Sequence, residues 1–362
     1  MSVTELFDHA RGTSPVERIT IRRPDDFHVH LRDGAMLEAV LPFTAAQFAR
    51  GVIMPNLVPP VTSVAMARGY RERILSSRPE GSDFQPLMTC YLTDATDPDE
   101  IETGFRDGVW VAAKLYPAGA TTNAHYGVTD IPALAGVFER METIGMPVLI
   151  HGESTDPAVD IFDREAAFME QSLLPLLGRH PGLKVVIEHV TTAETVDIVR
   201  AHAARAAGTI TPHHLVINRT SIFQGGLRPH LYCLPVAKRE RHRLALRKAV
   251  TSGEACFFIG TDTAPHRRSA KEAECCSAGI FGGATALQTY VQVFDEEGAL
   301  DRFEAFASVN GARFYGLELN RGTITLERRE SPVLAAVAVE DTEVVVFQGG
   351  QTLPWAVGEV TL

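Results

Sequence analysis

Residues 26–32 read DFHVHLR, a short strand-like run that ends in two histidines and an arginine. Side chains at positions i and i+2 of a strand point to the same side, so His28 and His30 are expected to face the same way. The pattern of a short apolar run that ends in polar residues recurs along the chain. Eight such runs are predicted to be strands: residues 27–31, 52–55, 87–92, 109–116, 147–151, 185–189, 209–211 and 256–260.

Helix-like stretches lie between these runs, at residues 36–49, 62–76, 131–144, 163–177 and 192–204. Eight strands that alternate with helices over about 240 residues predict an α/β fold, a TIM (β/α)8 barrel. After Asp262 the alternation stops. A helical region at residues 284–315 and strand-like runs at 333–339 and 344–347 are interpreted as a small C-terminal extension. We therefore expect a single domain over residues 1–362, with the barrel core at about 20–285 and the extension at about 286–362 packed on the barrel.

The composition is that of an ordinary globular protein: of 362 residues, 45% are hydrophobic and 22% are charged, and the formal net charge is −11. A nucleic-acid-binding protein would carry a basic stripe, so no such partner is expected. The first residues, MSVTELFDHARGTSPVER, lack the apolar segment of a secretory signal, and no apolar run is long enough to span a membrane. The five cysteines lack the spacing of a disulfide or zinc framework, which suggests reduced thiols in the cytoplasm.

The predicted strand ends carry residue types that bind metals, in FHVHLR, AAKLYP, LIHGE, IEHVTT and FIGTDTAPH. In TIM barrels the active site lies at the carboxyl ends of the strands. Each residue alone has a plainer interpretation: a histidine can be a hydrogen-bonded core residue, Asp262 can cap a helix, and Lys114 can extend to the barrel rim. Their joint occurrence at the correct strand ends predicts a catalytic metal site made of His28, His30, Lys114, His151, His189 and Asp262.

Lys114 lies inside the apolar run VWVAAKLYP, where a charged amine is costly to bury. A neutral amine can add CO₂ and become a carbamate, which is an anion able to bridge two cations. Two metals about 3.5–4 Å apart would hold a hydroxide between them at neutral pH. Zinc suits histidine and carboxylate ligands, and cobalt or manganese could substitute for it.

A set of longer motifs covers nearly the whole chain: DDFHVHLRDGAML, MPNLVPP, AAKLYPAGATTNAHYGV, LIHGE, IEHVTT, TPHHL, RPHLYCLPVAKR, GTDTAPH and FEAFASVNGARFYGL. With these motifs the sequence resembles the amidohydrolase superfamily and, within it, the dihydroorotases of the short bacterial type. The HxH motif alone would indicate only the superfamily. The combination of HVHLR, MPN, KLYPAGATTN and GTDTAPH is narrower.

The resemblance implies a role for each candidate residue. His28, His30 and Asp262 would bind one metal, His151 and His189 the other, and a carboxylated Lys114 would bridge the two. Arg32, Asn56 and His266 would grip the substrate carboxylate, as their hydrogen-bond donors allow. The remaining substrate-binding positions are Thr121 and Thr122, in a mobile lid at residues 117–128, and Leu234 and Ala278, which would act through their backbone groups. His214 matches a position near the metal centre but receives no role.

The implied reaction is the reversible cyclisation of N-carbamoyl-L-aspartate to L-dihydroorotate in de novo pyrimidine (UMP) biosynthesis. A hydroxide bridging two Zn²⁺ ions per subunit would attack the ring amide, and catalytic Asp262 would shuttle the proton. A cytoplasmic homodimer is expected. Two alternatives stay open. A hydantoinase or dihydropyrimidinase shares the metal ligands but does not need an arginine directly after HxH. A non-catalytic amidohydrolase-like scaffold would have lost its ligands, whereas every ligand position is filled in this sequence.

Overall fold

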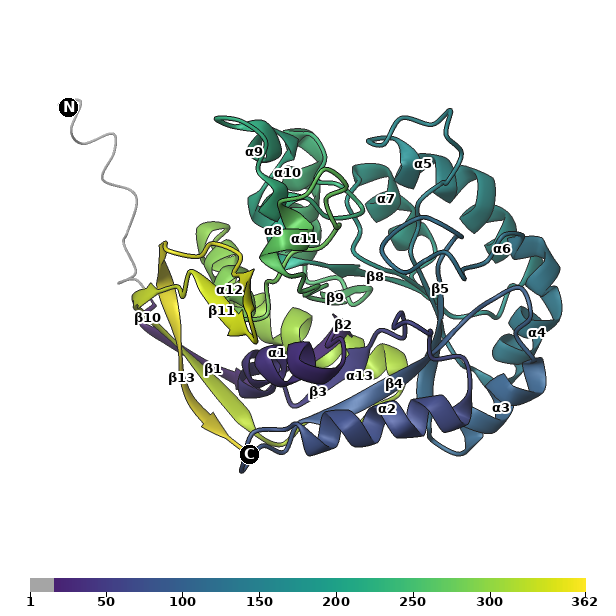
Figure 1. Cartoon of the computed structure of the whole chain (residues 1–362), viewed down its shortest axis with the longest axis horizontal. Helices are drawn as coiled ribbons and strands as arrows, with labels where there is room; N and C mark the ends of the chain where they lie inside the picture. The colour runs from purple at the N-terminus through teal and green to yellow at the C-terminus, as the bar shows by residue number, and fades with distance from the viewer. Residues whose placement is uncertain (1–15) are drawn as a thin grey trace, which may run out of the picture.

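The computed structural model describes residues 16–362. Its central sheet has eight parallel strands, each hydrogen-bonded to the next (Figure 1). In chain order they are β2 (Asp25–Val29), β3 (Arg50–Ile53), β4 (Gln85–Tyr91), β5 (Trp110–Leu115), β6 (Val148–Ile150), β7 (Val185–Ile187), β8 (Ala206–Ile210) and β9 (Phe257–Ile259). Each corresponds to one predicted strand, with bounds that differ by one to three residues at most ends. The expectation that the first residues carry no secretory signal mainly concerns residues 1–15, which lie outside the described range.

The sheet closes on itself between β9 and β2, through residues that follow β9. The Asp262 N–H donates to the His28 carbonyl (2.9 Å), and the His30 N–H donates to the Thr263 carbonyl (3.0 Å). Val29 and Thr263 form a parallel bridge at the same place. The predicted TIM (β/α)8 barrel is therefore confirmed.

Helices surround the barrel (Figure 1). They are α1 (Gly34–Gln47), α2 (Val64–Ser76), α3 (Pro98–Arg106), α4 (Ala135–Ile144), α5 (Arg164–Phe168), α6 (Leu174–Arg179), α7 (Ala193–Ala201), α8 (Pro212–Val216), α9 (Arg219–Phe223), α10 (Glu240–Val250), α11 (Arg268–Lys271), α12 (Ala286–Glu296) and α13 (Asn310–Tyr315). A π-helical turn at Met169–Leu173 joins α5 to α6, so the helix predicted at 163–177 is one run with an irregular centre. Among the described helices, none is long and apolar enough to cross a membrane.

A three-stranded antiparallel sheet, which the sequence analysis did not foresee, combines both ends of the described chain. Strand β1 (Arg18–Arg22) pairs with β10 (Thr323–Pro332), which pairs with β13 (Thr352–Thr361). The sheet lies beside α12 at the left of Figure 1, near the hairpin of β11 (Ala336–Val339) and β12 (Thr342–Val345). Because a strand that precedes the barrel joins the C-terminal strands, we propose that the chain folds as a single domain.

Polar and apolar layers alternate inside the barrel. One layer is apolar and includes Val52, Ala112, Leu149, Val186, Ala207 and Phe258. Two residues further along several strands, the inward positions become polar, with Lys114, His151, Glu188 and Thr209, all at most 1% exposed. Since strand side chains alternate with a period of two, the polar layer lies directly beyond the apolar one, at the carboxyl ends of the strands.

A β-bulge in β2 changes the direction in which the His28 side chain points. Asp26 pairs with Gly51 and Val29 pairs with Ile53, so β2 has one more residue than β3 over this interval. Such a β-bulge shifts the alternation of side chains. As a result Phe27 packs in the interior apolar layer against Tyr315 (ring centroids 5.1 Å apart), while the adjacent His28 reaches the polar layer.

The packing of α3 on β5 generates a stability prediction. A Cβ atom at Gly104 would lie 2.1 Å from Cε2 of the buried Trp110. We therefore expect Gly104→Ala to destabilise the fold by about 1–3 kcal/mol through overpacking. Gly69→Ala in α2 is the matched control, since its Cβ would approach nothing closer than 3.7 Å and alanine favours helix by up to about 1 kcal/mol. Thermal unfolding compares the two variants, and equal melting temperatures would contradict this packing.

Candidate functional site

The first group of candidate ligands comes from β2 and from the segment after β9. The Nε2 atoms of His28 and His30 lie 3.2 Å apart, and Asp262 Oδ1 lies 3.3 Å from the first and 3.2 Å from the second. Ligands about 2.0–2.1 Å from one tetrahedral ion lie about 3.3 Å from one another, so this spacing fits a single cation. All three residues are at most 7% exposed. Burial lowers the pKa of His30 to about 4, so its ring is neutral at pH 7, with a lone pair available to a metal.

The second group is formed by His151 and His189, which follow β6 and β7. His151 Nδ1 lies 3.2 Å from His189 Nε2, and the other nitrogen of His151 lies 2.8 Å from the Glu153 carboxylate. Burial, followed by the charge of His151, holds the pKa of His189 well below its usual value. The ring nitrogens of His151 and His189 that face each other suit a second cation.

Lys114 lies in the polar layer of the barrel and not at its rim. Its side chain is 0% exposed, and its Nζ has no hydrogen-bond partner among residues 16–362. Burial lowers its pKa to about 8, against the opposing charges of Glu188 and Asp262. A buried amine that loses its proton easily and has a free donor atom fits the predicted carbamate ligand. The residues present therefore fit a site for two cations.

Two buried glutamates hold the candidate histidines in place. Glu188 Oε2 lies 2.5 Å from His28 Nδ1 and accepts from the Thr209 hydroxyl (2.8 Å). Glu153 holds His151 in the same way. A carboxylate on one ring nitrogen fixes the tautomer that leaves the other nitrogen for a metal. The sequence analysis assigned no role to these glutamates, although each lies within two residues of a predicted ligand in a buried run.

Three of the predicted site residues have left-handed backbone conformations. The φ angles are 60° at Arg32, 43° at His189 and 46° at Asp262. Residues other than glycine rarely adopt positive φ, and such strain concentrates at functional sites. It redirects the chain directly after the strands, and a sequence pattern does not reveal it.

One side of the site, formed by Arg32 and His266, carries the positive charge of Arg32 and is called the positive rim. Arg32 Nε donates to the Pro265 carbonyl (3.2 Å), and Arg32 Nη2 lies 3.1 Å from His266 Nε2. That nitrogen also lies 2.9 Å from the Ala278 carbonyl, and the neutral ring can serve only one of these two partners. Burial, together with the charge of Arg32, lowers the pKa of His266 to about 2. Within the described residues no carboxylate lies within 4.0 Å of Arg32, so its charge is available to an anion.

Asn56 has a position that the sequence analysis only partly anticipated. Its Oδ1 accepts from His30 Nδ1 (2.8 Å), which points His30 Nε2 at Asp262. Its Nδ2 donates to the carbonyl of Thr122 (3.1 Å), so the same amide connects a candidate ligand to the predicted lid. Asn56 therefore orients His30, in addition to lining the pocket beside Arg32.

The predicted lid lies folded over the pocket. Thr121 and Thr122 line the cavity, and the Thr122 hydroxyl donates to the Ala278 carbonyl (3.2 Å). Leu234 and Ala278 line it as well.

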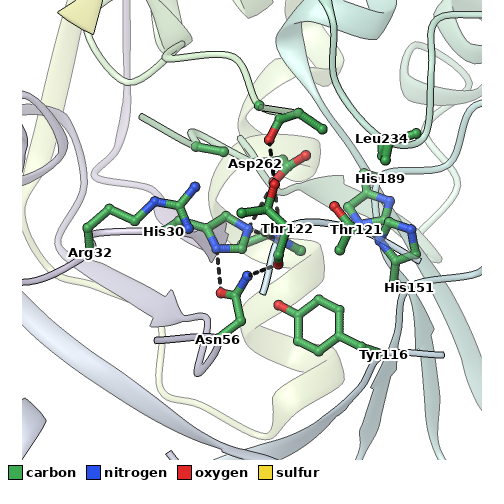
Figure 2. A pocket seen from close by; sticks show the side chains of 14 residues that line it. His30, Arg32, Asn56, Tyr116, Thr121, Thr122, His151, His189, Leu234 and Asp262 are labelled. Atoms are coloured by element: carbon green, nitrogen blue, oxygen red, sulfur yellow. Dashed lines mark hydrogen bonds and ion pairs between the residues drawn. The ribbon is translucent and has the colours of Figure 1, made fainter. Parts of the chain in front are cut away.

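In Figure 2, Arg32, His30 and Asn56 lie on one side, His151 and His189 lie on the opposite side, and Asp262 lies between them. The structure thus brings all the predicted site residues except Lys114 and His266 into the pocket lining. Lys114 Nζ lies 5.0 Å from the ring centroid of the lining residue Tyr116, and His266 contacts Arg32 and Ala278.

Tyr116 is a pocket residue that the sequence analysis missed. Its hydroxyl points into the space between Asn56 and His151 (Figure 2). It has no hydrogen-bond partner among the described residues, and its ring stacks on Tyr91 with centroids 5.2 Å apart. Burial raises its pKa well above the usual value, so the hydroxyl keeps its proton as a donor. Because Tyr116 lies two residues after Lys114 in the predicted strand 109–116, its side chain could have been predicted to point the same way.

His214, to which no role was assigned, supports the backbone of the rim. Its Nδ1 bonds to the Thr211 hydroxyl (2.8 Å), and its Nε2 lies 3.0 Å from the Pro235 carbonyl. His213, His214 and Cys233 are close enough to suggest another metal cluster. Because both ring nitrogens of His214 are already engaged, we interpret this group as a structural link between α8 and the Leu234–Pro235 segment.

Comparison with known proteins agrees with this geometry. A model of the amidohydrolase family matches residues 25–329. The chain belongs to the amidohydrolase family, and it is a hydrolase that acts on cyclic amides.

Within that family the chain is similar to dihydroorotases. The dihydroorotase of Sphingopyxis alaskensis is 58% identical over 339 residues, which cover 94% of this chain and 98% of that protein. The dihydroorotase structure from Campylobacter jejuni is 32% identical with a TM-score of 0.87, covering 94% of this chain and 98% of that one. A Saccharomyces cerevisiae dihydroorotase in complex with 5-fluoroorotic acid is 30% identical with a TM-score of 0.87, covering 95% and 99%. Among amidohydrolases, the chain is a member of the dihydroorotase family.

The Glu188–His28 contact generates a prediction about metal affinity. Glu188→Gln keeps the shape of the side chain but removes the charge that orients His28 and increases its basicity. We expect divalent metal to bind about 10–100-fold more weakly, as measured by competition with a chelator. Glu330→Gln, at an exposed position on β10, is the control. Equal affinities in the two variants would show that Glu188 does not support a metal ligand.

Proposed function

We propose that this chain catalyses the reversible interconversion of N-carbamoyl-L-aspartate and L-dihydroorotate, as a dihydroorotase of pyrimidine biosynthesis. The observation that carries the proposal is the juxtaposition of two features in one pocket. One is the double group of candidate metal ligands, and the other is the partly buried cation of Arg32, which has no carboxylate within 4.0 Å among residues 16–362. A cyclic amide that carries a carboxylate matches both features.

The carboxylate would bind at the positive rim. Arg32 has five N–H donors, of which the contacts to Pro265 and His266 use two. The planar guanidinium can present its remaining donors to a carboxylate in the bidentate geometry that makes such pairs strong. The yeast relative holds 5-fluoroorotic acid, a pyrimidine acid, which is consistent with a carboxylate-bearing ring as ligand.

The reaction would take place at the candidate metal ligands, on the side of the pocket away from Arg32. When bound, two divalent cations would polarise the ring carbonyl and lower the pKa of an attacking water. His28, His30 and Asp262 would hold one cation and His151 and His189 the other, with carboxylated Lys114 shared. Zinc as the resident ion, the lysine modification, a homodimer and a cytoplasmic location stay predictions.

Asp262 is the proposed proton carrier. In ring opening, water contributes its oxygen to the carbonyl carbon and one proton to the ring nitrogen that leaves. The Asp262 carboxylate is buried, which by itself raises its pKa, but its contacts with the rings of His28 and His30 outweigh that burial and hold its pKa well below the usual value. It is therefore ionised and able to accept the proton before passing it to the nitrogen. In ring closure the same carboxylate takes the proton from the carbamoyl nitrogen as that nitrogen attacks the side-chain carboxyl carbon, and one carboxyl oxygen leaves as water with this proton and a second one from solution.

Thr121 and Thr122 would close the pocket over the substrate. Their loop is docked through Asn56 and Ala278, and this position shields the reacting groups from water. The Tyr116 hydroxyl adds a further neutral donor to the lining.

The test compares three rings on the zinc-loaded protein: L-dihydroorotate, hydantoin and dihydrouracil. We expect rapid opening of dihydroorotate alone, abolished by a chelator. Arg32→Met should raise the KM for dihydroorotate about 10–100-fold, because hydrogen bonds to a charged group contribute about 1.5–3 kcal/mol. Arg329→Met, at an exposed position on β10, is the control and should leave the KM unchanged.

The other outcomes separate the alternatives. Opening only of the rings that lack a carboxylate would keep the metal site and identify another cyclic amidase. A protein that binds metal and opens none of the rings would indicate a non-catalytic scaffold. An unchanged KM in Arg32→Met would remove Arg32 from the substrate.

A further inference from the structure

A buried lysine outside the candidate metal centre, Lys271, contacts two backbone segments of the pocket rim at once. It is the last residue of α11 and is 3% exposed. Its Nζ donates to the carbonyls of Tyr232 (2.7 Å), Ser277 (2.8 Å) and Gly279 (2.8 Å). An ammonium has three donors, so this arrangement uses all of them.

The three acceptors belong to segments that line the pocket. Ser277 and Gly279 flank Ala278, and Tyr232 lies two residues before Leu234. The Gly279 N–H also donates to the Tyr232 carbonyl (3.0 Å), so the segments are joined directly beside the lysine. Leu234, Ala278 and Gly279 all line the cavity. Lys271 therefore fixes the spacing between two stretches of backbone that face the ligand.

The opposite side of the same loop contacts the lid and the positive rim. The Ala278 carbonyl accepts from the Thr122 hydroxyl (3.2 Å) and lies 2.9 Å from His266 Nε2. A displacement of residues 277–279 would therefore reach the lid as well as the rim. The metal-ligand groups have their own supports in Glu153 and Glu188, and Lys271 contacts neither.

The carbonyls take the place of a counter-ion for this ammonium. In residues 16–362, no carboxylate lies within 4.0 Å of Lys271. The ionisable groups that face it are the thiols of Cys233 and Cys276, the Tyr232 ring, whose centroid is 5.7 Å from Nζ, and the His266 imidazole. Burial raises the pKa of the Cys233 thiol and of the Tyr232 phenol, so both stay neutral. Burying a charge in this way is costly unless it is hydrogen-bonded, which favours a specific role over general packing.

We propose that Lys271 is a positioning residue for substrate binding, whose ammonium holds the backbone of Leu234 and Ala278 at the spacing that receives the edge of the cyclic amide. For the identity of that ligand, the inference rests on the proposed function. Lys271 does not touch the reacting atoms, so its removal should affect binding more than turnover.

The test uses Lys271→Met, which keeps the length of the side chain and removes the donors. Hydrogen–deuterium exchange of the amides in segments 231–234 and 277–280 should become about tenfold faster, while exchange in β5 stays unchanged. With L-dihydroorotate, the KM should rise about tenfold, with kcat and metal content close to those of the unmodified protein. Lys248→Met, at an exposed position of α10, is the matched control for loss of a positive charge.

The exchange measurement needs no substrate, so it separates this inference from the proposed function. If the unmodified protein does not open dihydroorotate, the proposed function fails while the exchange rates still decide whether Lys271 positions the rim. Unchanged exchange would overturn the positioning role, as would an unchanged KM or a loss of metal together with kcat.

A pH series on the unmodified protein and on Lys271→Met provides a second test. Burial lowers the pKa of Lys271 to about 8, so between pH 7 and 9 the ammonium loses a proton and with it one of three hydrogen bonds. The KM for dihydroorotate should therefore rise across this interval, and Lys271→Met, if it folds, should show no such rise. A KM independent of pH in the unmodified protein would contradict the proposal.

Discussion

The burial of charge at the carboxyl ends of the barrel strands is the constraint on which the rest of the site depends. Three carboxylates, those of Glu153, Glu188 and Asp262, are at most 5% exposed and share this space with the amine of Lys114. Buried charges are tolerated only when they are paired, hydrogen-bonded or bound to metal. His28, His30 and His151 each use one ring nitrogen for a carboxylate or an amide and direct the other toward a neighbouring candidate ligand. Divalent cations placed there would balance the acids, so that metal binding and stability of the folded barrel are coupled.

A second set of supports lies further out, where the pocket meets its rim. The rim has few ionised groups besides Arg32. Its shape depends on backbone segments that buried side chains outside the pocket hold by hydrogen bonds. His214 bonds to the Pro235 carbonyl, and Lys271 bonds to carbonyls on both sides of Ala278. The polar layer with the candidate metal ligands would therefore determine which reaction is possible. The backbone segments of the rim would determine which ring fits. Asn56 contacts both His30 and the lid, whereas Glu188 and Lys271 have separate hydrogen-bond partners, so substitutions of these two residues can affect turnover and binding separately.

The period-two alternation of strands and the residue types at their ends made the barrel, and the gathering of the candidate ligands at one end of it, predictable from the sequence. What escaped prediction depends on contacts between distant segments. The pairing of β1 with β10 joins residues about 300 positions apart, and β10 resembles an ordinary polar strand until its partners are known. The bulge in β2 and the positive φ angles at Arg32, His189 and Asp262 are set by tertiary packing. The roles of Glu153 and Glu188 follow from which ring nitrogen they contact, and a linear pattern does not specify this.

The most direct test of the account is the metal stoichiometry of the purified protein, by elemental analysis after equilibration with zinc and bicarbonate, alongside Lys114→Met. The account predicts two zinc ions per chain in the unmodified protein and the loss of at least one of them in the variant, since the shared ligand is gone. One ion or none in the unmodified protein, or two equally tightly bound ions in Lys114→Met, would contradict the assignment of a double metal site centred on the buried lysine.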